Sequence, residues 1–194
     1  MISTFTQWFL DSTLFFREWM VDPKRTGSVT PSSKHLSAAM TKWLPKNPDS
    51  YVLELGPGTG VVTNHLLENG LREDRLIVIE SNPNLVRMLR KKFSRAHIIC
   101  GDAWESDRIL KGLSPGVESV GAVISSLPLI NFSPEKATLL ARKIETLLEP
   151  SGYLVQFSYS IHRKRSRGSE GFRLHTSRIV WRNFPPARVY VYQK

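Results

Sequence analysis

The stretch V52-L-E-L-G-P-G-T-G60 decides the fold expected for this chain. It is an apolar run that ends in Gly56, Gly58 and Gly60. Glycine lets a strand turn sharply into a helix while a ligand lies against bare backbone. The dinucleotide-binding pattern G-x-G-x-x-G would need glycine where this chain has Val61, and the Gly-Lys-Ser/Thr end of a phosphate-binding loop is absent. Both phosphate-binding interpretations are therefore weakened.

Length and composition predict one domain with a substantial core, since the 194 residues are 41% apolar. We expect this domain to span residues 31–194, and residues 1–30 to form an N-terminal helix and linker. The single cysteine, Cys100, excludes an intramolecular disulfide and a cysteine-based zinc site, and no metal ion is expected. Residues 1–20 lack both a basic start and a long apolar run, so neither a signal peptide nor a membrane span is expected there.

The alternation of apolar runs with helical patterns predicts an α/β fold whose mostly parallel sheet is covered on both faces. The clearest helix is expected over residues 133–148, between a capping serine and a helix-breaking sequence. Residues 178–184 and 187–192 predict an antiparallel hairpin that closes a seven-stranded sheet. The other strands are expected at residues 51–55, 76–80, 97–100, 120–124 and 153–159.

The glycine motif that remains is G-x-G-x-G with an acid, Glu54, two residues before its first glycine. This pattern resembles the first motif of S-adenosylmethionine (SAM) methyltransferases. A generic glycine cluster between a strand and a helix is the alternative. A Rossmann-like sheet of seven strands that ends in an antiparallel hairpin is also the layout of class I SAM methyltransferases.

Three acids, each at the end of a different predicted strand, are the candidate SAM ligands. In an open parallel sheet, ligands lie beyond the carboxyl ends of the strands, where the strand order reverses. Glu80 lies at about the separation from the first glycine expected for an acid that accepts hydrogen bonds from ribose hydroxyls. Asp102 can accept from the adenine amino group, and Glu54 would face the amino end of the methionine moiety.

Four smaller residues complete the expected SAM contacts. Ser81 and Ala103 follow the ribose and adenine acids directly. Ser33 is expected to orient the methionine carboxylate, and Ser125 follows the fourth predicted strand.

The acceptor of the methyl group is expected beside I124-S-S-L-P-L129. Base-modifying methyltransferases resemble this stretch, but they carry an aromatic residue where this chain has Leu129. A nucleobase would lose stacking worth about 1–3 kcal/mol. An RNA or DNA adenine therefore becomes a less favoured acceptor than a small aliphatic amine, although nucleic acid is not excluded.

Motifs along nearly the whole chain point to one family. They are F16-R-E-W-M-V-D-P-K-R-T-G-S-V-T-P-S-S33, the glycine motif, G101-D-A103, S125-S-L-P-L129, V155-Q-F-S-Y-S160 and F184-P-P-A-R-V-Y-V-Y192. In order and spacing they resemble the small bacterial phospholipid N-methyltransferases. Methyltransferases of ornithine lipids are similar, and many such sequences also resemble ribosomal RNA adenine dimethyltransferases.

The resemblance implies SAM-dependent methylation of phosphatidylethanolamine through mono- and dimethyl intermediates to phosphatidylcholine. It implies a cytoplasmic enzyme that associates peripherally with the inner face of the membrane. As candidate catalytic groups we take the backbone carbonyls of Ser125, Ser126 and Leu127 and the hydroxyl of Tyr159, which would receive the N–H groups of the amine. No residue is an obvious general base, and Tyr159 has the alternative of a core tyrosine.

The charge of the chain is +10 and is unevenly distributed. Residues 161–194 hold nine lysines and arginines against one acid, Glu170, and no acid lies between positions 81 and 97. Such basic regions attract an anionic lipid surface or nucleic acid. Residues 1–20 carry aromatic residues on one helical face, which predicts either a docked helix or a helix at a membrane interface.

Overall fold

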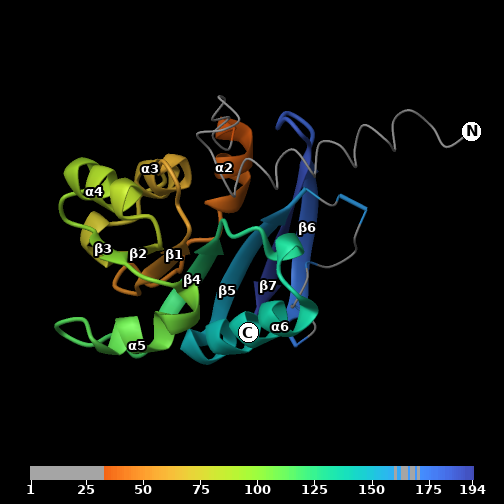
Figure 1. The fold of residues 1–194 in the computed structure, drawn as a ribbon. Helices are drawn as coiled ribbons and strands as arrows, with labels where there is room; N and C mark the ends of the chain where they lie inside the picture. The colour runs from red at the N-terminus through yellow and green to blue at the C-terminus, as the bar shows by residue number, and fades with distance from the viewer. Residues whose placement is uncertain (1–32, 160, 163–165, 167–168, 170) are drawn as a thin grey trace, which may run out of the picture.

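A seven-stranded sheet forms the centre of the protein (Figure 1). The computed structural model describes residues 33–159, 161, 162, 166, 169 and 171–194. Its strands are β1 (Val52–Leu55), β2 (Leu76–Glu80), β3 (His97–Cys100), β4 (Val120–Ser125), β5 (Leu148–Ser158), β6 (Arg173–Val180) and β7 (Ala187–Gln193). The predicted helix over residues 1–20 and the basic residues 163–165 and 167 lie outside the described residues.

The strand order is β3-β2-β1-β4-β5-β7-β6. Strands β1 to β5 pair in parallel, whereas β7 runs antiparallel to both of its neighbours. The order reverses between β1 and β4, and ligands of such sheets bind at this point, beyond the carboxyl ends of the strands. The predicted α/β, Rossmann-like fold with an antiparallel C-terminal hairpin is confirmed.

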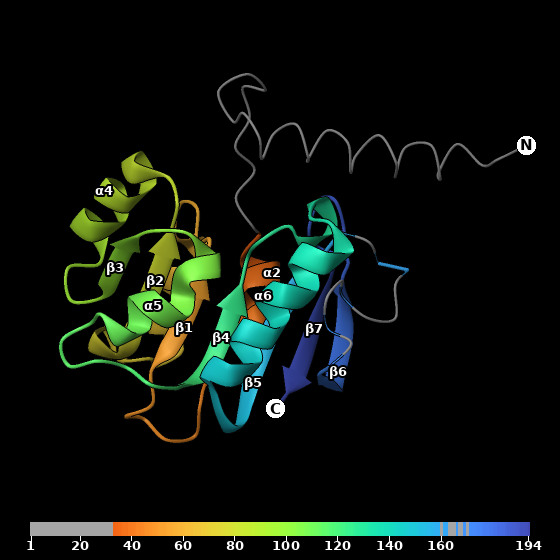
Figure 2. The ribbon, with the colours of Figure 1, turned by 60° about the horizontal axis from the view of Figure 1, so that its bottom comes forward.

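Helices cover both faces of the sheet (Figure 2). The helices are α2 (Lys34–Met40), α3 (Val61–Glu68), α4 (Pro83–Lys92), α5 (Ser106–Lys111) and α6 (Pro134–Leu147). The buried side chains of α2, α3 and α4 pack with one face of the sheet, and those of α5 and α6 pack with the other. Both faces of the sheet are therefore shielded from water, which fits the almost uninterrupted apolar runs of the inner strands.

Helix α6 forms where its sequence pattern predicts it. The Ser133 side chain accepts a hydrogen bond from the Lys136 N–H, and Pro134 occupies the first turn. The buried residues of α6 recur at helical spacing and include Leu140 and Ile144. The helix ends at Leu147, and β5 begins at the next residue instead of at residue 153.

The C-terminal hairpin is shifted relative to its prediction. We expected its first strand at residues 178–184, but β6 runs from Arg173 to Val180 and residues 181–186 form the turn. The Asn183 side chain folds this turn, because its Nδ2 donates to the Pro185 carbonyl at 2.7 Å. A buried side-chain hydrogen bond of this kind replaces the strand pairing expected for these residues.

Two features are absent from the described residues. No helix among them is long and apolar enough to cross a membrane. Within the same residues, no group of three or more histidine, cysteine or acidic side chains is arranged to hold a metal ion.

Candidate active site

The glycine motif forms a tight loop between β1 and α3. Gly56, Gly58 and Gly60 all have positive φ, at 66°, 59° and 79°, which is a conformation that favours glycine. The Gly56 N–H donates to the Ile79 carbonyl at 3.0 Å and so joins the loop to the end of β2. The motif therefore shapes the backbone at the point where the strand order reverses.

The three glycines meet different surroundings. A Cβ on Gly60 would lie 2.8 Å from Leu89 Cδ2 and 2.9 Å from Phe93 Cε2, so this glycine lets α3 approach α4. A Cβ on Gly56 would lie 2.7 Å from Leu127 Cδ2, in the loop after β4. A Cβ on Gly58 would meet nothing within 4 Å. Only this middle glycine borders open space in which a ligand can lie against the backbone.

Glu80 connects the glycine loop to α4. Its Oε2 accepts from the Gly58 N–H at 3.3 Å, and its Oε1 accepts from the Asn82 N–H at 2.9 Å. Its exposure is only 7%, and it ends β2 at the carboxyl edge of the sheet. Each carboxylate oxygen has room for a second hydrogen bond, which is what two neighbouring ribose hydroxyls would need.

Asp102 occupies the equivalent position after β3. Its Oδ1 accepts from the Trp104 N–H at 3.0 Å and caps the short helix Ala103–Glu105. The carboxylate is exposed, as is Ser81, while Ala103 is buried. The Trp104 ring packs edge-on against Phe132, with ring centroids 4.8 Å apart, and both rings pack against the hydrophobic core.

Glu54 lies below the loop and is fully buried. Its Oε2 accepts from the Thr63 hydroxyl at 2.7 Å, and its Oε1 has no hydrogen-bond partner among the described residues. Burial raises the pKa of Glu54 to about 8, although the hydrogen bond from Thr63 opposes the shift and the nearby Glu80 adds to it. The carboxyl is thus neutral at pH 7 unless a cation approaches, whereas the sequence predicted a carboxylate.

Ser33 and Tyr159 meet at a residue that the sequence did not single out. The Ser33 N–H donates to Asn183 Oδ1 at 3.1 Å, while its Oγ caps α2 by accepting from the Leu36 N–H. The Tyr159 hydroxyl hydrogen-bonds the Asn183 side chain, and burial raises the Tyr159 pKa above its usual value. Tyr159 therefore acts as a neutral hydrogen-bonding group at the carboxyl edge of the sheet.

The loop after β4 contains buried polar atoms that the fold leaves unsatisfied. The hydroxyls of Ser125 and Ser126 are inaccessible to water and have no hydrogen-bond partner among the described residues. The Leu127 carbonyl already accepts two hydrogen bonds, from Gln156 Nε2 and from the Leu129 N–H, each at 2.9 Å. The carbonyl of Leu127 thus holds the loop together, which leaves the two serines as the better placed groups for an incoming ligand.

Gln156 fixes this loop from the neighbouring strand. It is only 1% exposed and pairs with Ser125 in the register of β4 and β5. Its Nε2 donates to the carbonyls of Leu127 and Phe157, and its Oε1 has no partner among the described residues. Unsatisfied buried polar atoms are costly, so these three near the ends of β4 and β5 make the loop a candidate ligand site.

The residues at this edge fit SAM. Gly58 leaves backbone open beside Glu80, whose oxygens can accept from ribose hydroxyls, and exposed Asp102 follows on the next strand. The unpartnered Oε1 of Glu54 lies at the end of β1, where a cationic group would favour its ionised form. The donor set is a row of carboxylates and glycine backbone, as a nucleoside with a cationic amino-acid tail requires.

A comparison with protein families decides the identity of this fold and site. Residues 52–152, which hold the glycine motif, all three acids and the loop after β4, match the family model described as a methyltransferase domain. The chain belongs to the class I SAM-dependent methyltransferases. This methyltransferase takes SAM as its methyl donor.

Curated relatives of this methyltransferase fall into two groups. The ornithine lipid N-methyltransferase of Singulisphaera acidiphila is 31% identical over 183 residues, which cover 93% of this chain and 94% of the relative. The ribosomal RNA small subunit methyltransferase A of a Synechococcus strain is 35% identical over 92 residues, which cover 45% of this chain and 29% of that protein. The first similarity extends over both chains, whereas the second is confined to part of each.

Solved structures share the fold of the methyltransferase. The crystal structure of TrmN from Thermus thermophilus has a TM-score of 0.63 at 18% identity and covers 82% of this chain. The matched part is 48% of the TrmN chain. The putative methyltransferase yhhF from Escherichia coli has a TM-score of 0.62 at 15% identity, with 86% of this chain and 88% of that chain covered.

Sequence reasoning overlooked two positions of the methyltransferase. Gln156 belongs to a motif that carried the family resemblance, but a lone buried glutamine gives no signal before the strand pairing is known. Asn183 precedes the Phe-Pro-Pro sequence, and its position after a strand suggested nothing beyond a turn. Both act through contacts between segments far apart in the chain, namely Gln156 with Leu127 and Asn183 with Ser33.

Proposed function

We propose that this methyltransferase transfers methyl groups to the primary amine of a membrane-lipid headgroup. The observation that carries the proposal is the similarity to an ornithine lipid N-methyltransferase over nearly the full length of both chains. A match over 93% of the chain extends well beyond the SAM-binding half and includes the loop after β4. Similarity confined to the SAM-binding half would have left the chemical class of the methyl acceptor undetermined.

The acceptor side of the site supports an amine over a nucleobase. Leu129 is 8% exposed and packs into the core beside β4. An aliphatic side chain in this position offers no flat plate for a base, which loses about 1–3 kcal/mol of stacking. The hydroxyls of Ser125 and Ser126 are suited to a small polar group with several N–H donors.

The chemistry asks little of the protein beyond positioning. A primary alkylamine has a pKa of about 10.4, so it arrives protonated and must release a proton to water before its nitrogen can attack. SAM supplies the activated methyl group when it is bound. The serine hydroxyls and the neutral Tyr159 hydroxyl receive N–H groups and aim the nitrogen lone pair, and this alignment is the main source of rate enhancement in a displacement of this kind.

Two headgroups meet this description. The amine of an ornithine lipid is favoured by the named activity of the full-length relative. The amine of phosphatidylethanolamine is favoured by the motifs that resemble phospholipid N-methyltransferases, and its methylation would lead to phosphatidylcholine. Both are primary aliphatic amines, so the same hydroxyl groups serve either substrate.

Reaching such a substrate requires contact with the bilayer. We propose that the enzyme is cytoplasmic and binds peripherally to the inner face of the membrane, with residues 1–20 as an interfacial helix and the basic regions attracting anionic lipid. Anionic lipid headgroups attract lysine and arginine by about 1 kcal/mol for each residue near the surface. The excess of basic residues after residue 160 therefore favours the bound state.

A direct test uses labelled SAM and two kinds of vesicle. The purified full chain is incubated with vesicles that contain either ornithine lipid or phosphatidylethanolamine, and the extracted lipids are separated by chromatography. We expect label in methylated lipid from at least one vesicle type, and roughly 15-fold less label with the Glu80→Ala variant at a SAM concentration near the wild-type Kd, because a Kd raised about 30-fold leaves few sites occupied. The ratio between the two lipids ranks the substrates.

Methylation of RNA in place of lipid would contradict the proposed function. The partial similarity to ribosomal RNA methyltransferases makes RNA the competing acceptor. If label enters ribosomal RNA at a rate that vesicles do not change, and neither lipid is methylated, the proposed function is wrong.

A further inference from the structure

Large apolar side chains gather at the turn between β6 and β7. Four are exposed among the described residues: Met88 at 38%, Leu139 at 51%, Trp181 at 65% and Phe184 at 71%. The two most exposed of these belong to this turn, residues 181–186. Aromatic side chains at a protruding turn are expensive to leave in water, and they are typical of a surface that meets a partner.

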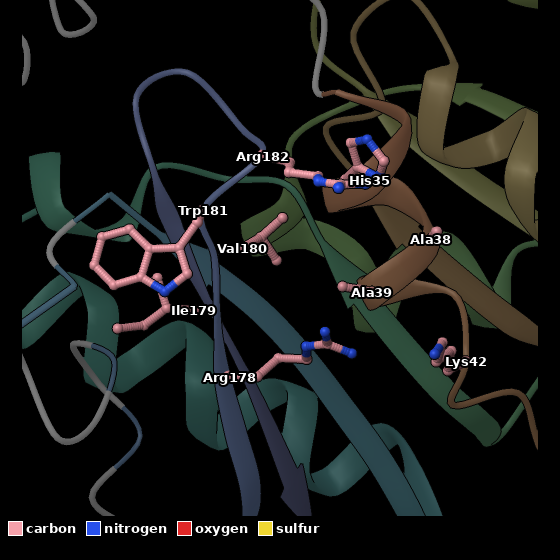
Figure 3. Close-up of a pocket in the computed structure, with 9 residues that line it drawn as sticks. All are labelled: His35, Ala38, Ala39, Lys42, Arg178, Ile179, Val180, Trp181 and Arg182. Atoms are coloured by element: carbon pink, nitrogen blue, oxygen red, sulfur yellow. The ribbon is translucent and has the colours of Figure 1, made fainter.

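An open basic groove adjoins the turn, between α2 and β6 (Figure 3). Its volume is about 480 Å³, and its basic lining consists of His35 from α2, Lys42 just after α2, Arg178 from β6 and Arg182 from the turn. All four side chains are exposed, and the described residues that line the groove include no acid. Lys42, Arg178 and Arg182 form no ion pair within the described chain, so their positive charge is not neutralised there.

The turn lies at the same edge of the sheet as the SAM site. Ser158, at the carboxyl end of β5, pairs with Arg188 near the start of β7, and Val180 at the end of β6 pairs with Ala187. Residues 181–186 therefore extend past the carboxyl ends of the parallel strands. The Glu80 and Gly58 edge of the sheet faces the same direction, because β1, β2, β4 and β5 run in parallel.

The turn is held firmly in this position. Asn183 is 4% exposed, and its Oδ1 accepts from the Ser33 N–H at the start of α2 while its Nδ2 donates to the Pro185 carbonyl. These contacts connect the turn to the helix that forms the other wall of the groove. The aromatic tip, formed by Trp181 and Phe184, and the basic groove thus form one rigid surface.

We propose that this surface docks on an anionic lipid bilayer and turns the SAM-binding edge toward it. The rings of Trp181 and Phe184 enter the boundary between headgroups and acyl chains, where aromatic side chains are favoured. The cations of the groove lie at the level of the anionic headgroups. That this orientation brings a lipid amine to the site rests on the proposed function, whereas the docking itself rests on the surface alone.

The placement of the aromatic rings favours a bilayer over RNA. Trp181 is one of the residues that line the groove, but its ring points away from α2 and from Lys42 (Figure 3). A single-stranded nucleic acid would need stacking rings beside the cations that follow its backbone. A bilayer accepts rings at the tip and cations around it, because its apolar and anionic layers lie at different depths.

The test measures flotation of the full chain with vesicles in the absence of SAM. The vesicles are phosphatidylcholine with or without about a third of phosphatidylglycerol. One variant, Trp181→Ser with Phe184→Ser, removes the tip, and a second, K42Q/R178Q/R182Q, removes the groove charge. The matched controls are Leu139→Ser, on the opposite face of the sheet, and K111Q/K136Q/R142Q, on α5 and α6.

We expect each test variant to bind anionic vesicles at least about tenfold more weakly than the wild type, and each control to stay within about twofold. Salt near 1 M shortens the screening length to about 3 Å, so it should abolish the difference in vesicle binding between the charge variant and the wild type. The difference between the tip variant and the wild type should remain. Each test variant should have the same melting temperature as the wild type, which shows that its fold is intact. If the double variant unfolds, the single Trp181→Ser variant replaces it.

Three outcomes would overturn the proposal: wild-type vesicle binding by both test variants, equal losses in the controls, or lost binding to RNA with vesicle binding unchanged. The last outcome would assign the surface to nucleic acid. Failure here is separable from failure of the proposed function. If the test variants dock more weakly but the wild type methylates no lipid, only the proposed function is wrong. If lipid is methylated but the test variants dock as strongly as the wild type, only the proposed docking surface is wrong.

Discussion

The two halves of the carboxyl edge differ in how completely their polar groups are satisfied. In the half formed by β1, β2 and β3, Glu80 and Asp102 accept hydrogen bonds from backbone N–H groups at the carboxyl edge, while the buried Oε1 of Glu54 has no partner among the described residues. In the half formed by β4 and β5, Ser125, Ser126 and Gln156 present buried polar atoms without partners among the described residues. Two of the three donor-side acids are thus held by the backbone before a ligand binds, whereas we propose that the acceptor side is completed by what binds there.

The largest effect is expected where the glycine loop meets α4. Gly60→Ala forces a Cβ against Leu89 and Phe93 and puts alanine at a φ of 79°. The left-handed backbone costs about 1–2 kcal/mol and the crowded core about 1–3 kcal/mol. Urea unfolding should therefore show a loss of about 3 kcal/mol in the free energy of unfolding.

Gly58→Ala is the matched control, because its Cβ meets nothing within 4 Å. It should cost only about 1 kcal/mol of stability but weaken SAM binding, since its methyl group occupies the open space beside Glu80. Equal destabilisation by the two alanines would mean that the three glycines do not have the separate roles described above.

The next effect is the pH dependence of the free energy of unfolding that Glu54 causes. Its pKa is about 8 in the folded protein and 4.5 in the unfolded reference, so the folded state holds the proton more tightly. Stability is full below pH 4.5 and falls as the pH rises toward 8, at up to about 1.4 kcal/mol per pH unit. Glu54→Gln removes this titration. Between pH 5 and pH 8, the variant should therefore gain roughly 2–4 kcal/mol relative to the wild type.

The measurement is the free energy of unfolding of both proteins at a series of pH values without SAM. Glu118→Gln, at an exposed position before β4, serves as the control. If the difference between the wild type and Glu54→Gln is the same at pH 5 and pH 8, Glu54 is ionised in the fold, and the neutral carboxyl inferred here is wrong.

A third prediction targets the donor half alone. Glu80→Ala removes an acceptor for ribose hydroxyls and also leaves Gly58 and Asn82 without their partner. Hydrogen bonds to a charged group are worth about 1.5–3 kcal/mol, so calorimetry should show a SAM Kd raised roughly 30-fold. Glu68→Ala should leave it within about twofold. An unchanged Kd for the Glu80 variant would reject its ribose role.

The smallest effect should be confined to the acceptor half. Gln156→Ala releases the Leu127 carbonyl and loosens the loop that carries the two serines. Misplacement of a reacting group is costly, so kcat/KM for the lipid amine should fall about tenfold while the SAM Kd stays within about twofold. Gln193→Ala, at the opposite end of the sheet, is the matched control. A raised SAM Kd with normal turnover in the Gln156 variant would show that the two halves are not separate.

Local sequence patterns locate the glycine loop and the strand-end acids better than the contacts of the loop after β4, and the reason is physical. Glycines, strand-end acids and capping residues act within a few positions of one another, so Gly56 to Gly60, Glu80 and Asp102 can be recognised by local spacing. The ionisation of Glu54 cannot be predicted in this way, because it depends on burial by elements far along the chain. The same holds for the contacts of Gln156 and Asn183, which exist only after β4, β5 and β7 are assembled.

The hairpin shows the same limit within the fold. Its existence is predicted by two apolar runs around a pair of prolines, but its register is not. Trp181 and Phe184 looked like strand residues, yet they stand exposed in the turn because Asn183 bonds to Pro185 and to the start of α2. Tertiary hydrogen bonds override local β propensity here.

One competition assay tests the central claim most directly. The purified full chain is mixed with labelled SAM and with total lipid vesicles and ribosomal RNA from the same bacterium, and the label is counted in the organic and aqueous phases. We predict that nearly all of the label enters the organic phase, in lipids whose headgroup amine carries new methyl groups. Label that enters the RNA while the lipid fraction stays unlabelled would contradict the account.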